Sequence, residues 1–193
     1  GLGASVTSTT GASITIDPVW LEMGPGSMKF SPNGDKLVLT NTTSPNLIQL
    51  FDFNKSTGVF SNPQTIFNIP SYTATLEGNY GAEFSPNSNV LYISDFNNVL
   101  QYDISSGIAA TIIASRIVLG TPTTGNFGQL QLGPDGKIYS TESRNTFIGI
   151  INSPNTIGLG CNYNPAGLDL DPGFIFSNDL RLGLPSLLTT IPT

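Results

Sequence analysis

The sequence predicts an all-β protein made of β-propeller blades, and two observations carry that prediction. One motif occurs three times: a short strand of alternating apolar and polar residues, a turn around a proline, and a second apolar strand. Among the 193 residues, 38% are hydrophobic, with 21 Gly and 14 Pro, a composition that supplies both a core and frequent turns. No amphipathic helical stretch of comparable length interrupts the pattern.

Each copy of the motif is typical of a β-hairpin. The first strand ends at Ser or Gly, followed by Pro, then Asn or Asp, then Gly or Ser. Proline presets φ, and Asn-Gly or Asp-Gly supplies the positive φ that a hairpin needs. We therefore expect superposable hairpins at 32–34, 86–88 and 134–136, flanked by buried side chains. Those side chains are Phe30, Leu37, Leu39, Phe84, Leu91, Ile93, Leu132 and Ile138.

Further strands follow each hairpin. Segments 46–53 and 98–104 share one apolar pattern and lead to Ser/Gly turns, and 146–151 holds the same place in the third copy. The turn prolines lie 54 and 48 residues apart, and four strands at such a period are typical of a propeller blade. The β-rich stretches expected to complete the first two units are 64–69, 110–113 and 116–119.

These repeats predict one domain over residues 1–193. The expected blades are 26–70, 80–120 and 126–188. Propellers typically have about four to eight blades, so three blades indicate the C-terminal part of a larger propeller whose remainder is absent or lies in another chain. Contact with that protein partner is expected near 19–21 and 182–185. A compact four-bladed ring that uses both termini is the alternative.

The charge of the chain excludes several classes of function. Only 10% of the residues are charged, and seven basic against thirteen acidic residues give a net charge of −6. Nucleic-acid binding requires a basic surface, which is missing. No apolar run reaches the roughly 18 residues of a membrane helix, so no membrane insertion is expected. A polar but weakly charged surface favours an extracellular or cell-surface location.

Residues that commonly carry chemistry are scarce. The chain has no His, which removes the commonest general base and the commonest zinc ligand. Its one cysteine, Cys161, is interpreted as a small buried hydrophobe. The sequence therefore predicts that the chain is not an enzyme and that it holds no cofactor other than, in one segment, calcium.

That segment is 168–173. It places Asp169 and Asp171 on one side of an extended stretch, and carboxylate oxygens of this kind are suitable calcium ligands. The alternative is an ordinary acidic loop. Other oxygen donors close in sequence are Asn162, Asn164 and Asp179.

Three further groups have two interpretations each. Asp52 and Asp103 hold matching blade positions and could form a carboxylate ring at the channel or accept bonds from backbone N–H groups. Polar loops after the second strands are either solvated or the metal-bearing loops of a propeller hydrolase; they contain Asp95, Asn97, Asn98, Glu142, Arg144 and Asn145. Aromatic residues could stack on a glycan or pack between blades; they are Trp20, Tyr72, Tyr80 and Tyr163.

The third repeat adds a resemblance to a family. The segments 130–139, 149–155, 160–163 and 182–185, in this order, resemble the propeller region of large Bacteroidetes surface proteins exported by the type IX secretion route. In that family the region commonly precedes PKD domains and a C-terminal sorting domain. The resemblance covers residues 26 to 188 and implies export, the cell surface, and adhesion, gliding or polymer binding. It supplies no catalytic residues.

The function expected from the sequence is therefore a non-enzymatic extracellular or cell-surface module. Such a module would bind a protein or a glycan, or serve as a scaffold in adhesion, gliding or assembly. The alternative is a metal-dependent propeller hydrolase of the lactonase type.

Overall fold

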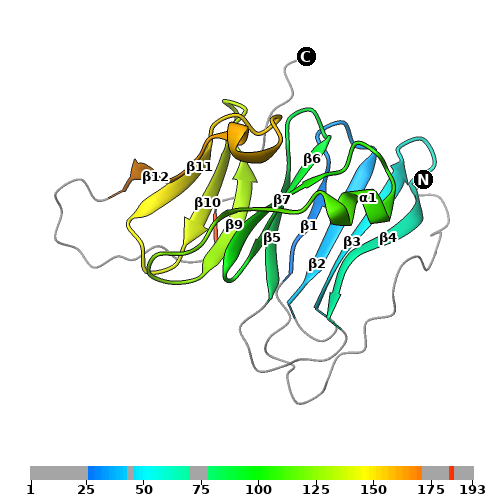
Figure 1. The fold of residues 1–193 in the computed structure, drawn as a ribbon. Coiled ribbons are helices and arrows are strands. Elements are labelled where there is room, and N and C mark those ends of the chain that lie inside the picture. Colours follow the sequence, from blue (N-terminus) through cyan, green and yellow to red (C-terminus); the bar gives the residue numbers. More distant parts are fainter. Residues whose placement is uncertain (1–25, 43–45, 70–77, 171–182, 185–193) are drawn as a thin grey trace, which may run out of the picture.

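A computed structural model describes residues 26–42, 46–69, 78–170 and 183–184, and in it the chain forms three four-stranded antiparallel sheets (Figure 1). Within each sheet every strand pairs with the next along the chain. We call the sheets blades 1, 2 and 3. Blade 1 contains β1 (Met28–Phe30), β2 (Lys36–Asn41), β3 (Asn46–Asn54) and β4 (Val59–Ile69). Blade 2 contains β5 (Asn79–Phe84), β6 (Val90–Asp95), β7 (Asn98–Asp103) and β8 (Ile117–Gly120). Blade 3 contains β9 (Phe127–Leu132), β10 (Ile138–Glu142), β11 (Phe147–Ile151) and β12 (Tyr163–Asp169).

The three predicted hairpins are confirmed. Each turn closes with a backbone bond between its flanks, for example from Ser31 N to Lys36 O at 2.9 Å and from Ser85 N to Val90 O at 2.8 Å. Gly34 and Gly136 have φ of 71° and 78°, and Ser88 adopts 62° at the same place. The left-handed conformation is thus set by the turn geometry, since the second copy keeps it without glycine.

The blades are stacked face to face, and each pair of neighbours shares a core. The face of blade 2 that carries Phe84 and Leu91 packs on the face of blade 1 that carries Val38 and Ile48. We call the first kind of face leading and the second trailing. The trailing face of blade 2 packs in turn on the leading face of blade 3, which carries Ile138.

Hydroxyl groups reinforce both interfaces at one repeated position. Thr40 Oγ1 on β2 donates to Tyr80 O of blade 2 at 3.1 Å. Its equivalent, Ser94 Oγ on β6, donates to Gly128 O of blade 3. A hydroxyl side chain at the same repeat position therefore bonds to the backbone of the following blade, as expected for radial repetition of one unit.

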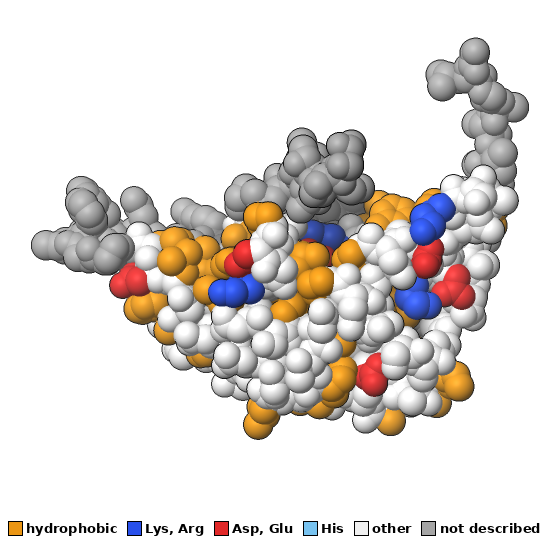
Figure 2. All heavy atoms as spheres, turned by 90° about the horizontal axis from the view of Figure 1, so that it is seen from above, with side chains coloured by type: hydrophobic (Ala, Val, Ile, Leu, Met, Phe, Trp, Pro, Cys, Tyr) orange, Lys and Arg blue, Asp and Glu red, His pale blue; other side chains and the backbone are white. Residues whose placement is uncertain are grey.

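The first strand of each blade lies innermost. β5 contacts both β1 and β9, so the three first strands lie side by side while the later strands lie further out. Seen from above, the described atoms have a rounded outline on one side and a straighter one on the other (Figure 2). The fold is therefore a sector of a β-propeller, as the sequence predicted.

One predicted strand is wrong. Residues 110–113 lie in a short helix, α1 (Ala109–Ala114), between β7 and β8. Its Ile112 is fully buried in the core between blades 1 and 2, and the helix contacts β4. Burial of that side chain outweighs the weak β preference of an Ala-Thr-Ile-Ile run. A short 3-10 helix, η2 (Gly158–Cys161), joins β11 to β12.

Most of the predicted core is confirmed, with one clear exception. Phe84, Leu91, Ile93 and Ile138 are fully buried, and Leu37 nearly so. Leu39 and Leu132 are half-buried. Phe30 is 46% exposed, against 0% for its repeat equivalent Phe84, because it lies on the leading face of blade 1, where no further blade precedes it among the described residues.

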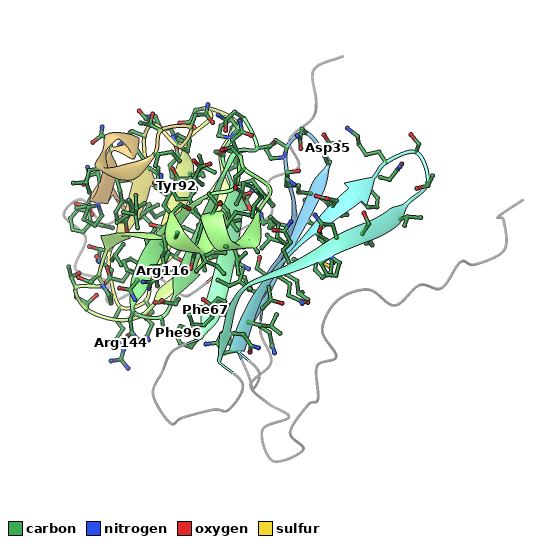
Figure 3. The ribbon with its side chains drawn as sticks, turned by 45° about the vertical axis from the view of Figure 1, so that its right-hand side comes forward. Asp35, Phe67, Tyr92, Phe96, Arg116 and Arg144 are labelled. Atoms are coloured by element: carbon green, nitrogen blue, oxygen red, sulfur yellow. The ribbon has the colours of Figure 1, made fainter. Side chains whose placement is uncertain are left out.

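The blades have two distinct ends. The β1–β2, β5–β6 and β9–β10 turns lie at one end, which includes Asp35, and the loops after the second strands lie at the other, near Phe96 and Arg144 (Figure 3). We call them the turn end and the loop end. Within the described ranges no helix is long and apolar enough to cross a bilayer.

Candidate functional site at the blade axis

A polar group from each blade meets on the innermost strands. Lys29 Nζ donates to Glu83 Oε2 at 2.9 Å and to Gln131 Oε1 at 3.0 Å. Lys29 lies on β1, Glu83 on β5 and Gln131 on β9. We call these three residues the axial cluster. Each is the polar residue of the apolar-polar-apolar motif that ends its strand, so the repeat itself brings them together.

The carboxylate of the axial cluster, that of Glu83, also accepts hydrogen bonds from two backbone N–H groups. Glu83 Oε2 also accepts a bond from Leu132 N at 2.9 Å, and Glu83 Oε1 accepts one from Phe84 N at 3.0 Å. The side chain of Glu83 is 5% exposed and that of Lys29 is 29% exposed. An ionised carboxylate at such burial needs a charged partner and hydrogen bonds, and Glu83 has both. Lys29 is the member of the pair that solvent reaches.

Glu142, at the loop end of blade 3, accepts hydrogen bonds from the loop between β8 and β9. Glu142 Oε1 accepts bonds from Thr123 N at 2.7 Å, Thr124 N at 2.6 Å and Gly125 N at 3.3 Å, and Asn145 donates to Oε2 at 3.0 Å. Burial acts to raise the pKa of Glu142, but these bonds, led by the one from Thr124, outweigh it and lower the pKa. With most of its acceptor sites used, Glu142 fixes the β8–β9 loop instead of facing a ligand.

Asp95 has a comparable structural role. Its Oδ1 accepts bonds from Asn97 N at 2.8 Å and Asn98 Nδ2 at 3.0 Å, which shape the turn between β6 and β7. Burial raises the pKa of Asp95 in spite of these bonds and of the nearby Arg116 charge. Arg144 has a positive φ of 63° and is exposed. The loop residues named from the sequence thus stabilise two separate turns and do not converge on one metal site.

The two repeated aspartates do not form a ring at the channel. Asp52 and Asp103 lie on β3 and β7, the third strands of their blades. Asp103 accepts a bond from Ser105 N at 3.0 Å, which confirms the backbone-acceptor interpretation. Asp52 instead pairs with Lys36 Nζ at 2.9 Å.

The calcium prediction falls partly outside the described residues. Asp169 is the exposed last residue of β12, whereas Asp171 lies outside the described ranges, as does Asp179. In the part of the chain that is described, no three His, Cys, Asp or Glu side chains lie close enough together to hold a metal ion.

The described aromatic candidates pack against protein. Tyr80 contacts Phe96, with ring centroids 5.9 Å apart. Tyr163 packs against the blade 2–blade 3 core, and a side chain at Gly120 would come within 2.7 Å of its ring. Burial raises the pKa of Tyr163 to about 12. Trp20 and Tyr72 lie outside the described residues.

Sequence reasoning missed a buried polar network between blades 2 and 3. Tyr92 is fully buried, and its hydroxyl donates to Pro154 O at 2.9 Å while accepting from Gln101 Nε2 at 2.8 Å. Gln101 Oε1 accepts from Gly158 N at 2.6 Å. Cys161 is buried in the same region, which confirms its interpretation as a small hydrophobe, and burial raises the pKa of its thiol. The only sequence signal was a polar Gln inside an apolar strand.

Comparisons with known proteins add the following. No protein-family model matches the chain, and a comparison with curated proteins found no match. Similar solved structures include a gluconolactonase from Xanthomonas campestris (17% identity, TM-score 0.44, covering 62% of this chain and 34% of that one). A periplasmic gluconolactonase from Pseudomonas aeruginosa has 15% identity and a TM-score of 0.46, over 64% of this chain and 37% of that one.

A third similar structure is the holo PQQ domain of a pyranose dehydrogenase from Coprinopsis cinerea, with 11% identity and a TM-score of 0.47, over 68% of this chain and 34% of that one. The chain thus spans about a third of the length of each of these three proteins. At these identities and scores the similarity concerns the fold alone. The resemblance to type IX-exported surface proteins is tested by none of these comparisons and stays a prediction.

The prediction that the chain is not an enzyme is corrected here. It depended on the absence of His and of a recognisable catalytic constellation, yet proteins of similar fold include two gluconolactonases. The missing histidine is no argument against catalysis, because Glu and Lys also act as general bases and acids. Nothing in the fold or the comparisons supports a non-enzymatic adhesion role.

Proposed function

We propose that the chain is part of a β-propeller hydrolase that acts on small cyclic esters of the lactone type. The observation that carries this proposal is the axial cluster, an ammonium and a carboxylate 2.9 Å apart on the innermost strands of neighbouring blades. Ligand sites are concave, with a few convergent polar groups on an apolar frame, and the axial cluster offers such groups.

Lys29 is suited to bind the ester carbonyl. An ammonium group has three N–H donors, and Lys29 uses two of them for Glu83 and Gln131. The third can donate to the carbonyl oxygen of a substrate at the axis. The charge that develops on that oxygen when the carbonyl is attacked would then face a fixed cation, which lowers the barrier.

Glu83 is suited to activate water. Its ionised carboxylate has about four acceptor sites, of which three are used by Lys29, Leu132 N and Phe84 N. A water bound at the fourth would attack the carbonyl carbon and give its proton to Glu83. The ring C–O bond then breaks, and Glu83 returns the proton to the leaving alkoxide.

A divalent metal does not fit this cluster. Glu83 is its only carboxylate, and Lys29, which carries a positive charge, is bonded directly to that carboxylate. A metal ion there would be repelled by the ammonium and would lack anionic ligands. The proposed reaction therefore proceeds by acid–base and electrostatic catalysis alone.

Hydrolysis of glucono-1,5-lactone, followed with a pH indicator, tests the proposal. Wild type should exceed the spontaneous rate, and Lys29→Met and Glu83→Gln should each lower kcat/KM by about 10²-fold or more, the usual contribution of one acid–base group. Lys55→Met is the matched control, since Lys55 forms an exposed pair with Asp35 at 2.9 Å. No acceleration on a panel of lactones, or full activity in both axial variants, would refute the proposal. Loss of activity with EDTA would refute its metal-free form.

We also propose that the protein acts outside the cytoplasm. The support is compositional: only 10% of the residues are charged, which gives a polar but weakly charged surface. Fractionation of the native host tests this, and recovery of the protein from the cytosol alone would contradict it.

A further inference from the structure

The two outward faces of the blade stack are the leading face of blade 1 and the trailing face of blade 3. They carry the same repeat positions as the faces that are buried between neighbouring blades. On the leading face of blade 1, Met28 and Phe30 are 67% and 46% exposed, whereas the corresponding Ala82 and Phe84 of blade 2 are 1% and 0% exposed. Phe30 belongs to an aromatic cluster, with its ring 5.0 Å from Phe53. A face of this kind packs on a preceding blade twice within this chain.

Side chains on the trailing face of blade 3 are likewise more exposed than the equivalent side chains on the trailing face of blade 1. Ile148 and Leu168 are paired across β11 and β12 on this face. Ile148 is half-buried and Leu168 is 45% exposed, whereas Ile48, at the position of Ile148 in blade 1, is fully buried.

We propose that a second copy of this chain occupies these faces. The leading face of blade 1 in each copy would pack on the trailing face of blade 3 in the other, which closes a two-fold symmetric ring of six blades. Among its described residues each copy carries one outward face of each kind, so two contacts of the same type cover both faces of each copy. Contacts between unlike faces form a closed ring when the rotation between copies permits it.

Two observations favour a second copy as the occupant. The new contact would continue the interface that already joins blades 1 to 2 and 2 to 3, with the same apolar positions on both sides. The described atoms also form a half-disc, with hydrophobic side chains visible along its straighter side (Figure 2). Two half-discs joined along that side give a full one. Exposed apolar side chains that lie together on one face are typical of interaction sites.

The oligomeric state of the full chain tests the proposal independently of lactone hydrolysis. Sedimentation velocity at about 100 µM, where a complex with a Kd below ~10 µM is mostly assembled, should give twice the 20.4 kDa of one chain. Phe30→Asp should give a monomer. Ile113→Asp is the control, since Ile113 is 47% exposed but lies on α1, away from both faces. Near-UV circular dichroism verifies that each variant folds.

A mixing experiment tests the pairing of unlike faces. Phe30→Asp and Leu168→Asp should each be monomeric alone, and an equal mixture should recover a weaker heterodimer through the one intact contact. A monomeric wild type would overturn the proposal and assign the faces to another occupant. So would a dimer that survives Phe30→Asp, or open chains of more than two copies in place of a closed dimer.

Discussion

Tyr92 and Tyr139 hold equivalent positions in blades 2 and 3, and removal of their hydroxyl groups should have very different effects. Tyr92 is fully buried, and its hydroxyl bonds to Pro154 O at 2.9 Å and to Gln101 Nε2 at 2.8 Å. The Tyr139 hydroxyl donates to the exposed Asp135 carboxylate at 2.9 Å. The substitution Tyr→Phe removes the same single atom at both positions and creates no steric conflict.

The expected magnitudes follow from these environments. In Tyr92→Phe, a buried carbonyl loses its donor, which costs about 1–3 kcal/mol, and a second bond worth about 1 kcal/mol is lost. Gln101 keeps its bond to Thr156 O at 2.9 Å, which limits the total to about 2 kcal/mol. In Tyr139→Phe, measured at a protein concentration low enough for the chain to be monomeric, water replaces the lost partner, so the cost should stay below about 0.5 kcal/mol, as for most surface substitutions.

Urea denaturation of both variants measures this difference. The urea concentration at the unfolding midpoint should fall for Tyr92→Phe and stay unchanged for Tyr139→Phe. The slope m should not change in either variant, because the surface area exposed on unfolding stays the same. Amide exchange at Gly158, which donates to Gln101 Oε1 at 2.6 Å, should accelerate only in Tyr92→Phe. Equal losses in the two variants, or a loss below about 0.5 kcal/mol for Tyr92→Phe, would refute the reasoning.

Three further substitutions test other parts of the structure. Phe84→Ala should cost about 3–5 kcal/mol by thermal or urea unfolding, the usual range for a buried aromatic residue, and a loss below about 1 kcal/mol would place Phe84 at a surface. Gly81→Ala should cost about 1–3 kcal/mol, because the new Cβ would lie 2.7 Å from Gly128 O of blade 3; an unchanged midpoint would contradict this contact. Glu142 has a lowered pKa, so it stabilises the fold above the carboxyl pKa of the unfolded chain and loses that effect as the pH falls through its folded value. The difference in unfolding free energy between wild type and Glu142→Gln should therefore be largest near neutral pH and close as the pH falls below the ordinary value of 4.5; a pH-independent difference would contradict the lowered pKa.

The blade repeat was predictable because its signals are local. Proline, Asn or Asp, and Gly within four residues determine a hairpin turn, and strands that alternate apolar residues flank it. The α1 helix was not predictable, because Ile112 is buried by contacts with another blade that its own segment does not reveal. Exposure of Phe30 was missed for a similar reason, since burial at this position depends on a neighbouring blade and not on the repeat.

The axial cluster was not identified from the sequence. Lys29, Glu83 and Gln131 appeared as the polar residue of each first strand, but their convergence depends on the radial arrangement of the blades. The sequence analysis instead named the carboxylates in the loops after the second strands as candidates, because loops usually carry function. In the structure, the Glu142 carboxylate accepts hydrogen bonds from backbone N–H groups of a single loop. These groups lie about 18 positions away in the sequence, so no short motif indicates the contact.

A double-mutant cycle on Lys29 and Glu83 tests the central claim, that consecutive blades meet at a common axis through their first strands. Lys29→Met, Glu83→Gln and the double variant are each unfolded in urea. We expect a coupling energy of about 1–3 kcal/mol, as for residues in direct contact within one network. The exposed pair of Lys55 and Asp35 serves as the reference and should give below about 1 kcal/mol. Additivity of the two axial substitutions within about 0.3–0.5 kcal/mol, as found for distant sites, would contradict the account.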